Sequence, residues 1–286
     1  MIAYEGPNAE QIRYWNEVMG PQWAAMDGTL SAQIRPFGLY AMERLAVRPG
    51  EKVLDIGCGC GETTAELARR VGPGGRVVGL DISEPLAEKA RQAIAGFDHA
   101  EIRVADAQIA PIETEVFDGL FSRFGVMFFA QPELAFGHLL QALRPGGRVA
   151  FVCWRALVEN LWMTVPAMAV ANHVPLKRPD PNAPGPFAFA DYARVRGILE
   201  AAGFVNIKHE AVHEPISVAG GESLDGAVAL LMRLGPAGAA LREANAGPEL
   251  LEAARSSIRA AIAPYETPKG VAMPASVWIV TAERPV

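Results

Sequence analysis

The sequence predicts an α/β fold with a Rossmann-like, doubly wound sheet of seven strands, mostly parallel with an antiparallel last strand. Residues 53–56 form a short apolar run that leads into a glycine-rich turn, which is typical of a strand covered on both faces. Strand and helix patterns then alternate through residue 154, which favours parallel pairing. Two late helices precede a last strand, which suits antiparallel insertion at the sheet edge.

The elements follow in order from apolar periodicity and turn residues. Helical spacing predicts two or three amphipathic helices before the first strand, the first of them broken at Gly20-Pro21. Strands are expected at residues 53–56, 76–80, 102–105, 117–122, 149–154, 204–211 (which can extend to 218) and 271–282. Helices are expected at 62–70, 85–95, 131–143, 191–202, 222–234 and 241–262, and a tight turn at 144–148.

Composition and charge narrow the classes of partner. The 286 residues are 50% hydrophobic and carry a formal net charge of −6, without a block of Lys or Arg. Since nucleic-acid substrates usually require a basic face, a nucleic-acid partner is not expected. The first residues do not resemble a signal peptide, and the apolar stretch 156–176 is a poor membrane span. Three cysteines offer no disulfide framework, so we predict a cytoplasmic protein. A zinc site at Cys58 and Cys60 would need two further ligands beside the glycine loop, so no metal is expected.

The glycine-rich turn is predicted to hold a ligand. Gly57, Gly59 and Gly61 follow the strand at every second position, and a helix pattern starts at Glu62. Glycine tolerates positive φ and lets a ligand approach the backbone closely. A helix N-terminus adds free N–H groups. The dinucleotide pattern G-x-G-x-x-G would need a glycine at position 62, which counts against a nicotinamide cofactor.

Asp55 inside the strand, followed by G-x-G-x-G, resembles motif I of the class I S-adenosylmethionine (SAM) methyltransferases. The resemblance covers about residues 45–210 and implies that SAM is the cofactor and S-adenosylhomocysteine (SAH) the product. Asp55 could then help to receive the SAM ammonium, and loop N–H groups its carboxylate. The chain has Ser-Arg-Phe-Gly at 122–125 in place of a Pro-Pro motif, and it lacks acidic residues between Leu120 and Ala130. Both features resemble the metal-free, small-molecule branch.

Two acidic residues follow the second and third predicted strands. Asp81 is placed to accept hydrogen bonds from both ribose hydroxyls, a requirement shared by NAD and SAM. The alternative, a helix-capping Asp, is weaker because Ser83 is better placed to cap the next helix. In the family, the acid after the third strand accepts the adenine amine, which implies this role for Asp106. The predicted cofactor-binding residues are Asp55, Gly57, Cys58, Gly59, Gly61, Thr63, Asp81, Ile82, Asp106, Ala107 and Ser122.

Two further regions are expected to shape a substrate pocket. Residues 1–48 are predicted to form a helical cover over the SAM-binding domain 49–286. The proline-rich insertion 156–190 is predicted to form a cap or an oligomer contact. His173 is the one histidine worth testing as a general base. Arg123 could hold an anionic acceptor, or pair with a surface carboxylate. The predicted substrate residues are Tyr14, Trp15, Trp23, Arg123, Phe124, Met127 and Trp162. For the N-terminal aromatics, for Phe124 and for Met127, packing in the core is an alternative.

The sequence thus predicts a SAM-dependent methyltransferase that acts on a small molecule, as a monomer or homodimer. Transfer of a methyl group from a sulfonium is an in-line displacement, so alignment is the main task of the protein. A hydroxyl or carbon acceptor would also need a base, whereas an amine or thiol would not. Two alternatives stay open, a SAM-binding protein with another role and an NAD(P)-dependent oxidoreductase. The acceptor and the methylated atom are not predicted.

Overall fold

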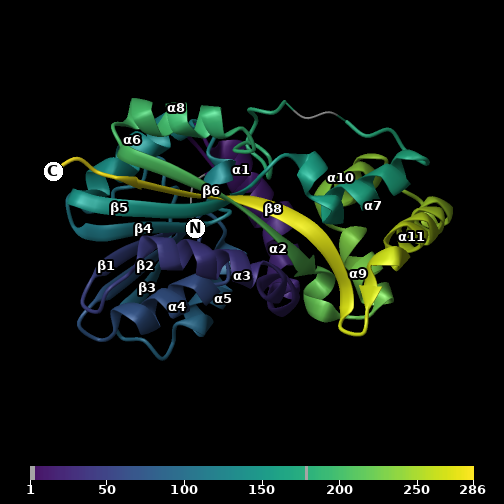
Figure 1. Cartoon of the computed structure of the whole chain (residues 1–286), viewed down its shortest axis with the longest axis horizontal. Helices are drawn as coiled ribbons and strands as arrows, with labels where there is room; N and C mark the ends of the chain where they lie inside the picture. The colour runs from purple at the N-terminus through teal and green to yellow at the C-terminus, as the bar shows by residue number, and fades with distance from the viewer. Residues whose placement is uncertain (1–3, 178–179) are drawn as a thin grey trace.

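The computed structural model describes residues 4–177 and 180–286. Residues 1–3 of the expected helical cover and 178–179 of the expected insertion lie outside the described residues. The core of the molecule is a twisted sheet with helices on both faces, and a group of further helices lies at one end (Figure 1).

Seven strands form the main sheet, and the predicted α/β class is confirmed. Their order is β3 (Ala100–Val104), β2 (Arg76–Asp81), β1 (Lys52–Ile56), β4 (Phe117–Arg123), β5 (Leu143–Trp154), β8 (Gly270–Glu283) and β6 (Val205–Ser217). The first five are parallel, and β8 is antiparallel to both of its neighbours. A short strand, β7 (Glu266–Thr267), pairs with β8 outside this order.

The position of the last strand differs from the expected one. β8 lies between β5 and β6, so β6 forms the edge of the sheet instead. Most residues of β8 are buried, whereas most residues of β6 are exposed. An apolar strand gains more from an interior position, and a polar strand protects an edge. The tight turn expected at 144–148 is an irregular start of β5, where the pairing register with β4 shifts.

The helices divide between the two faces of the sheet. α3 (Asp27–Leu45), α4 (Glu62–Val71) and α5 (Glu84–Ala93) cover one face, and α6 (Pro132–Ala142) and α8 (Tyr192–Ala202) cover the other (Figure 1). In α4, Leu67, Ala68 and Val71 are buried on the sheet side, while Arg69 is exposed. This spacing is the amphipathic pattern that a surface helix needs. α4 begins directly after Gly61, so its N-terminus lies at the glycine loop.

The N-terminal residues form a chain of short helices before α3. These are α1 (Ala9–Arg13), a π-helix over Tyr14–Val18 and α2 (Met19–Ala25). The expected helix break at Gly20-Pro21 is wrong, because both residues lie inside α2. Pro21 falls in the first turn of α2, where a missing backbone N–H costs no helical hydrogen bond. The change in helix type comes earlier, at the π-helix.

Four helices gather at the far end of the long β6–β8 pair and form a helical lobe (Figure 1). They are α7 (Leu161–Ala171), α9 (Leu224–Leu231), α10 (Gly235–Glu243) and α11 (Pro248–Ile262). The last predicted helix, 241–262, is wrong because Asn245, at φ 47°, and Gly247-Pro248 interrupt it. The expected insertion 156–190 contains α7, which packs on α10 and α11.

Within the described ranges, no single helix has the length and apolar character of a membrane span, although α9 and α10, bent by 56°, meet that test as a pair.

Candidate cofactor and active site

The glycine loop after β1 contains two kinds of glycine. All three glycines have positive φ, 66° at Gly57, 56° at Gly59 and 85° at Gly61. A Cβ atom on Gly57 would lie 2.7 Å from the Cα of Gly125, and one on Gly61 would lie 2.7 Å from the Cα of Ala90. A Cβ atom on Gly59 would meet nothing within 4 Å. Gly57 and Gly61 therefore permit close backbone packing, while Gly59 faces open space.

Asp55 links the end of β1 to the first turn of α4 by hydrogen bonds. Its Oδ2 accepts hydrogen bonds from the hydroxyls of Thr63 and Thr64, both at 2.7 Å. The residue is fully buried, and its Oδ1 has no partner among the described residues. Burial raises the pKa of Asp55 to about 6, although the two threonine hydrogen bonds and the charge of Arg123 act to lower it. An unpaired buried oxygen of this kind suits a cationic or donor partner.

Asp81 ends β2 and holds the centre of the loop. Its Oδ2 accepts from the backbone N–H of Gly59 at 2.8 Å, and its Oδ1 accepts from Ser83 N at 2.9 Å. Only 9% of the residue is exposed, and burial raises the pKa of its carboxyl to about 6, against the opposing effect of these hydrogen bonds. The expected cap by the Ser83 side chain is absent because its hydroxyl donates to Trp15 O in the π-helix. Asn16 instead accepts from Glu84 N at the start of α5.

Asp106 follows β3 and keeps one oxygen unpaired. Its Oδ1 accepts from Gln108 N at 3.0 Å and from Asn8 Nδ2 at 3.3 Å. Its Oδ2 and the Nε2 of Gln108 are both buried, and neither has a partner within the described residues. Burial raises the pKa of Asp106. A free acceptor and a free donor two residues apart fit adenine, whose amine donates and whose ring nitrogens accept.

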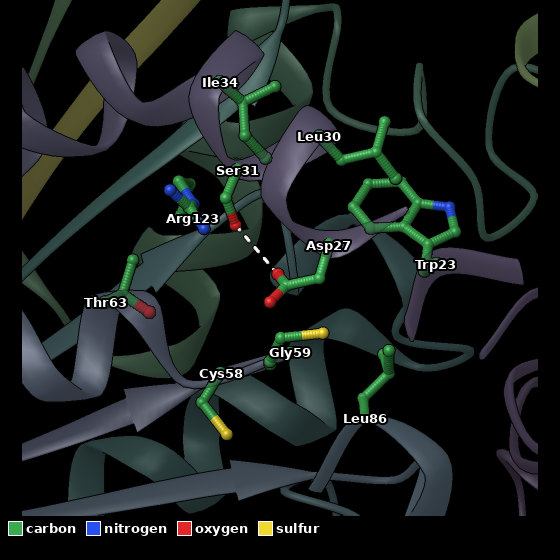
Figure 2. Close-up of a pocket in the computed structure, with 12 residues that line it drawn as sticks. Trp23, Asp27, Leu30, Ser31, Ile34, Cys58, Gly59, Thr63, Leu86 and Arg123 are labelled. Carbon is green, nitrogen blue, oxygen red and sulfur yellow. Dashed lines mark hydrogen bonds between the residues drawn. The ribbon is translucent and has the colours of Figure 1, made fainter. Parts of the chain in front are cut away.

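A cleft of about 440 Å³, which includes space open to solvent, lies between the loop and α3 (Figure 2). The sequence predicts six of its lining residues, namely Trp23, Gly57, Cys58, Gly59, Thr63 and Arg123. It misses six others, namely Asp27, Leu30, Ser31, Ile34, Cys60 and Leu86.

The missed residues on α3 had a recognisable signal. Asp27, Leu30, Ser31 and Ile34 follow the i, i+3, i+4, i+7 spacing of one helix face, so two polar residues interrupt an apolar stripe. The Ser31 hydroxyl donates to Asp27 Oδ1 at 3.0 Å. Figure 2 shows Asp27 reaching from α3 toward Gly59 on the opposite wall.

Arg123 brings positive charge to the same cleft. It ends β4, and its guanidinium contacts Glu62 at 2.6 Å. Glu62 also contacts the more exposed Arg35 at 2.8 Å. Phe124 follows with φ 63°, a left-handed conformation that costs a non-glycine residue roughly 1–3 kcal/mol and is often found at functional sites. Arg123 lines the cleft together with the glycine loop.

The remaining predicted cofactor residues surround the loop without lining the cleft. Ser122 is buried, and its hydroxyl donates to Ile56 O at 2.7 Å and accepts from Gly125 N at 3.2 Å. It thereby joins the ends of β1 and β4. Ile82 is half-buried beside Asp81, and its carbonyl accepts from Asn16 Nδ2 at 2.8 Å. Ala107 is buried next to Asp106.

The predicted substrate residues separate into two groups. Trp23 and Arg123 line the cleft, and Trp23 packs edge-on against Trp15, which itself contacts Tyr14. The other group is buried. The ring of Phe124 stacks on that of Trp154, with 4.3 Å between the ring centroids. Met127 and Trp162 are 1% and 6% exposed. His173 lies after α7, where its Nε2 is 2.8 Å from the Ser257 hydroxyl, and it is not a lining residue.

A metal site has no support in the part of the chain that the structure describes, since no group of three His, Cys, Asp or Glu side chains there could hold an ion. Cys58 is buried, and burial raises the pKa of its thiol, which disfavours the thiolate that a metal would bind.

One known protein family matches the part of the chain that contains the glycine loop. Residues 53–147 match the family model described as a methyltransferase domain. Over these residues the chain is similar to methyltransferase domains. The matched range runs from β1 into β5 and includes the glycine loop, Asp81 and Asp106.

Particular relatives extend the comparison. An uncharacterized 37.1 kDa protein in transposon TN4556 of Streptomyces fradiae is 34% identical over 40% of this chain and 33% of its own length. A demethylmenaquinone methyltransferase of Staphylococcus aureus is 29% identical over 50% of this chain and 59% of its own length. The chain therefore spans between a third and three fifths of these relatives. The fold resembles phosphoethanolamine N-methyltransferase 2 of Haemonchus contortus, with a TM-score of 0.52 and 15% identity over 100% of this chain and 61% of that one.

Proposed function

We propose that this protein binds SAM across the glycine loop and transfers its methyl group to a small-molecule acceptor in the cleft beside α3. The observation that carries the proposal is the open space at Gly59, whose N–H donates to Asp81 at the end of β2, with Asp106 just after the adjacent strand β3. Such a crevice at the carboxyl ends of parallel strands is the usual ligand site of this architecture.

The cofactor supplies a methyl group on a positively charged sulfur, and the acceptor's electron pair forms the new bond as the sulfur keeps the electrons of the old one. The residues of the chain bind and align. Asp81 is proposed to accept the ribose hydroxyls, and Asp106 the adenine amine, at the oxygen that has no partner among the described residues. Alignment of this kind can contribute roughly 7–11 kcal/mol to lowering the barrier.

The acceptor is proposed to be a small molecule with an apolar body. Trp23, Leu30 and Ile34 give the helix wall of the cleft an apolar surface, and Trp23 belongs to a cluster of aromatic rings. The Staphylococcus aureus relative is named for demethylmenaquinone, which is consistent with an aromatic acceptor. Arg123 could contact an anionic group, either on the acceptor or on the carboxylate of SAM.

A dedicated base is not part of the proposal. His173 lies in the helical lobe, bonded to Ser257, and does not line the cleft. Its geometry gives no support to a role as general base. An acceptor that ionises easily, or an amine, could be methylated without one. A cytoplasmic location and a monomeric or dimeric state remain proposals from the sequence.

The experiment that tests the cofactor is calorimetric titration of the purified protein with SAH, with NAD and NADH in parallel. Micromolar binding of SAH alone is the expected result. Binding of a nicotinamide cofactor instead would refute the proposal. Turnover is then tested with labelled SAM and a panel of aromatic and amine acceptors. Cofactor binding without methyl transfer to any acceptor would favour a SAM-binding protein with another role.

A further inference from the structure

We propose that Asp27, oriented by Ser31, is a cofactor-contacting residue whose carboxylate receives the positively charged atoms of SAM. This inference rests on the proposed function and assigns a contact from the helix wall of the cleft, outside the matched domain.

The first argument is geometric. Asp27 begins α3, and the Ser31 hydroxyl, one turn later, donates to its Oδ1 at 3.0 Å. This hydrogen bond fixes the carboxylate and leaves Oδ2 available. Figure 2 shows the group directed across the cleft toward Gly59, the glycine that faces open space. None of the ion pairs formed within the described ranges includes Asp27.

The second argument is charge. Asp27 provides the one carboxylate among the described lining residues, and Arg123 provides the one guanidinium. Arg123 already contacts Glu62, which removes part of its positive potential. The carboxylate of Asp27 has no such partner, so the cleft offers a negative site next to the loop. SAM has two cationic centres, its ammonium and its sulfonium, and either would gain from a nearby carboxylate.

The third argument is a comparison with Asp55, the carboxylate from which this contact is expected on sequence. Asp55 has no exposed surface, and Thr63 and Thr64 occupy its Oδ2. Asp27 is half-buried and reaches the cleft directly. Asp27 and Cys60 line the same cleft, and burial, followed by the charge of Asp27 and a hydrogen bond with it, raises the pKa of the Cys60 thiol to about 12. A carboxylate that influences Cys60 is close enough to influence a ligand over Gly59.

Two other roles would explain the position of Asp27. An acid in the first turn of a helix stabilises the helix through its dipole. A carboxylate in an active site can also act on the acceptor as a base. The three roles differ in how binding of cofactor analogues responds to loss of the charge.

The test is calorimetric titration of wild type, Asp27→Asn, Ser31→Ala and Glu43→Gln. Glu43 is an exposed acid in the same helix, away from the cleft, so it controls for the change in net charge. The ligands are SAM, SAH, sinefungin, whose amine stands in place of the methyl sulfonium, and methylthioadenosine, which has no cation. Thermal unfolding of each variant shows whether the fold is retained.

We expect Asp27→Asn to weaken SAM binding on the order of tenfold, as for the loss of a charged hydrogen bond, with a smaller loss for Ser31→Ala and none for Glu43→Gln. Methylthioadenosine affinity should not change. An equal loss for SAH identifies the ammonium as the partner, and a loss confined to SAM and sinefungin identifies the sulfonium.

Unchanged affinity for all four ligands, with slower turnover, would mean that Asp27 acts on the acceptor and would overturn the inference. An equal loss for methylthioadenosine would mean a structural role and would also overturn it. Failure of the wild type to bind any of these ligands is a separate result, because it refutes the proposed function itself.

Discussion

The two walls of the cleft are built in different ways. On the loop wall, which is the side of the cleft formed by the glycine loop, the nearby carboxylates already accept hydrogen bonds within the protein. Asp55 accepts from Thr63 and Thr64, and Asp81 accepts from Gly59 and Ser83. On the helix wall, Asp27 accepts a hydrogen bond from Ser31 and directs its carboxylate into the cleft. The difference indicates a division of labour in which the loop wall sets the shape of the site and the helix wall supplies charge and apolar contact.

The largest expected effect concerns the two kinds of glycine on the loop wall. Gly61→Ala should lower the free energy of unfolding by at least about 3 kcal/mol. The alanine would have to adopt φ 85°, and its Cβ would lie 2.7 Å from the Cα of Ala90 in α5. Gly59→Ala should cost about 1 kcal/mol in stability, because its Cβ meets only open space, yet it should weaken SAH binding. Denaturant unfolding and calorimetry measure the two effects. Equal destabilisation by both variants would contradict the distinction between them.

The next effect concerns the loop-wall carboxylate proposed to bind ribose. Asp81→Ala should weaken SAH binding by about 2–3 kcal/mol, since it removes a charged acceptor and loosens Gly59. Glu133→Ala, an exposed acid on α6, is the matched control and should leave affinity unchanged. Calorimetric titration gives both values. Wild-type affinity in the Asp81 variant would show that the ribose binds elsewhere.

Adenine recognition should give a smaller effect. Asp106→Ala should weaken SAH binding by about 1–2 kcal/mol, because Oδ2 is proposed to accept the adenine amine. The deaminated analogue, S-inosylhomocysteine, has a carbonyl in place of that amine and should bind the wild type more weakly than SAH. The Asp106 variant should lose this preference. If it discriminates between the two ligands as well as the wild type does, another group must read the amine.

The smallest effect is the pH dependence of the loop wall, and it has opposite signs for stability and binding. Burial raises the pKa of Asp55 and of Asp81 to about 6, above the 3.8 expected in the unfolded chain. Between these values the folded state binds more protons than the unfolded state. The free energy of unfolding should therefore rise by about 1 kcal/mol per carboxyl as the pH falls from 7 to 5.

Over the same range, SAH affinity should fall, because a protonated Asp81 accepts hydrogen bonds less well. Unfolding and titration at several pH values check the two signs. Asp55→Asn should lose about half of the pH-dependent gain in stability. A stability that falls between pH 7 and 5 in the wild type, but not in a variant lacking both carboxyls, would show that the two groups are stabilised as anions.

Short-range patterns account for what could be predicted correctly. The run Val53-Leu54-Asp55-Ile56 and the glycines after it specify β1 and the loop, because a continuous apolar run and positive φ are local features of the chain. Asp81 and Asp106 could be placed at neighbouring strand ends because parallel strands finish at the same edge. The error in the strand order comes from long-range packing. The interior position of β8 depends on two partner strands, and the helical lobe depends on contacts of α7 with α10 and α11.

The loop wall follows from the sequence alone, since its glycines, threonines and strand-end acids are neighbours along the chain or fall at fixed strand ends. The helix wall depends on packing between distant parts of the chain. Asp27 lies 32 residues before Gly59, and no local pattern predicts that α3 packs with Asp27 facing the glycine loop. Tertiary packing also decided that Asp55 is closed off from the cleft, while Phe124, Met127 and Trp162 are buried. Accessibility is set by everything that packs around a side chain, and residue type and spacing do not contain that information.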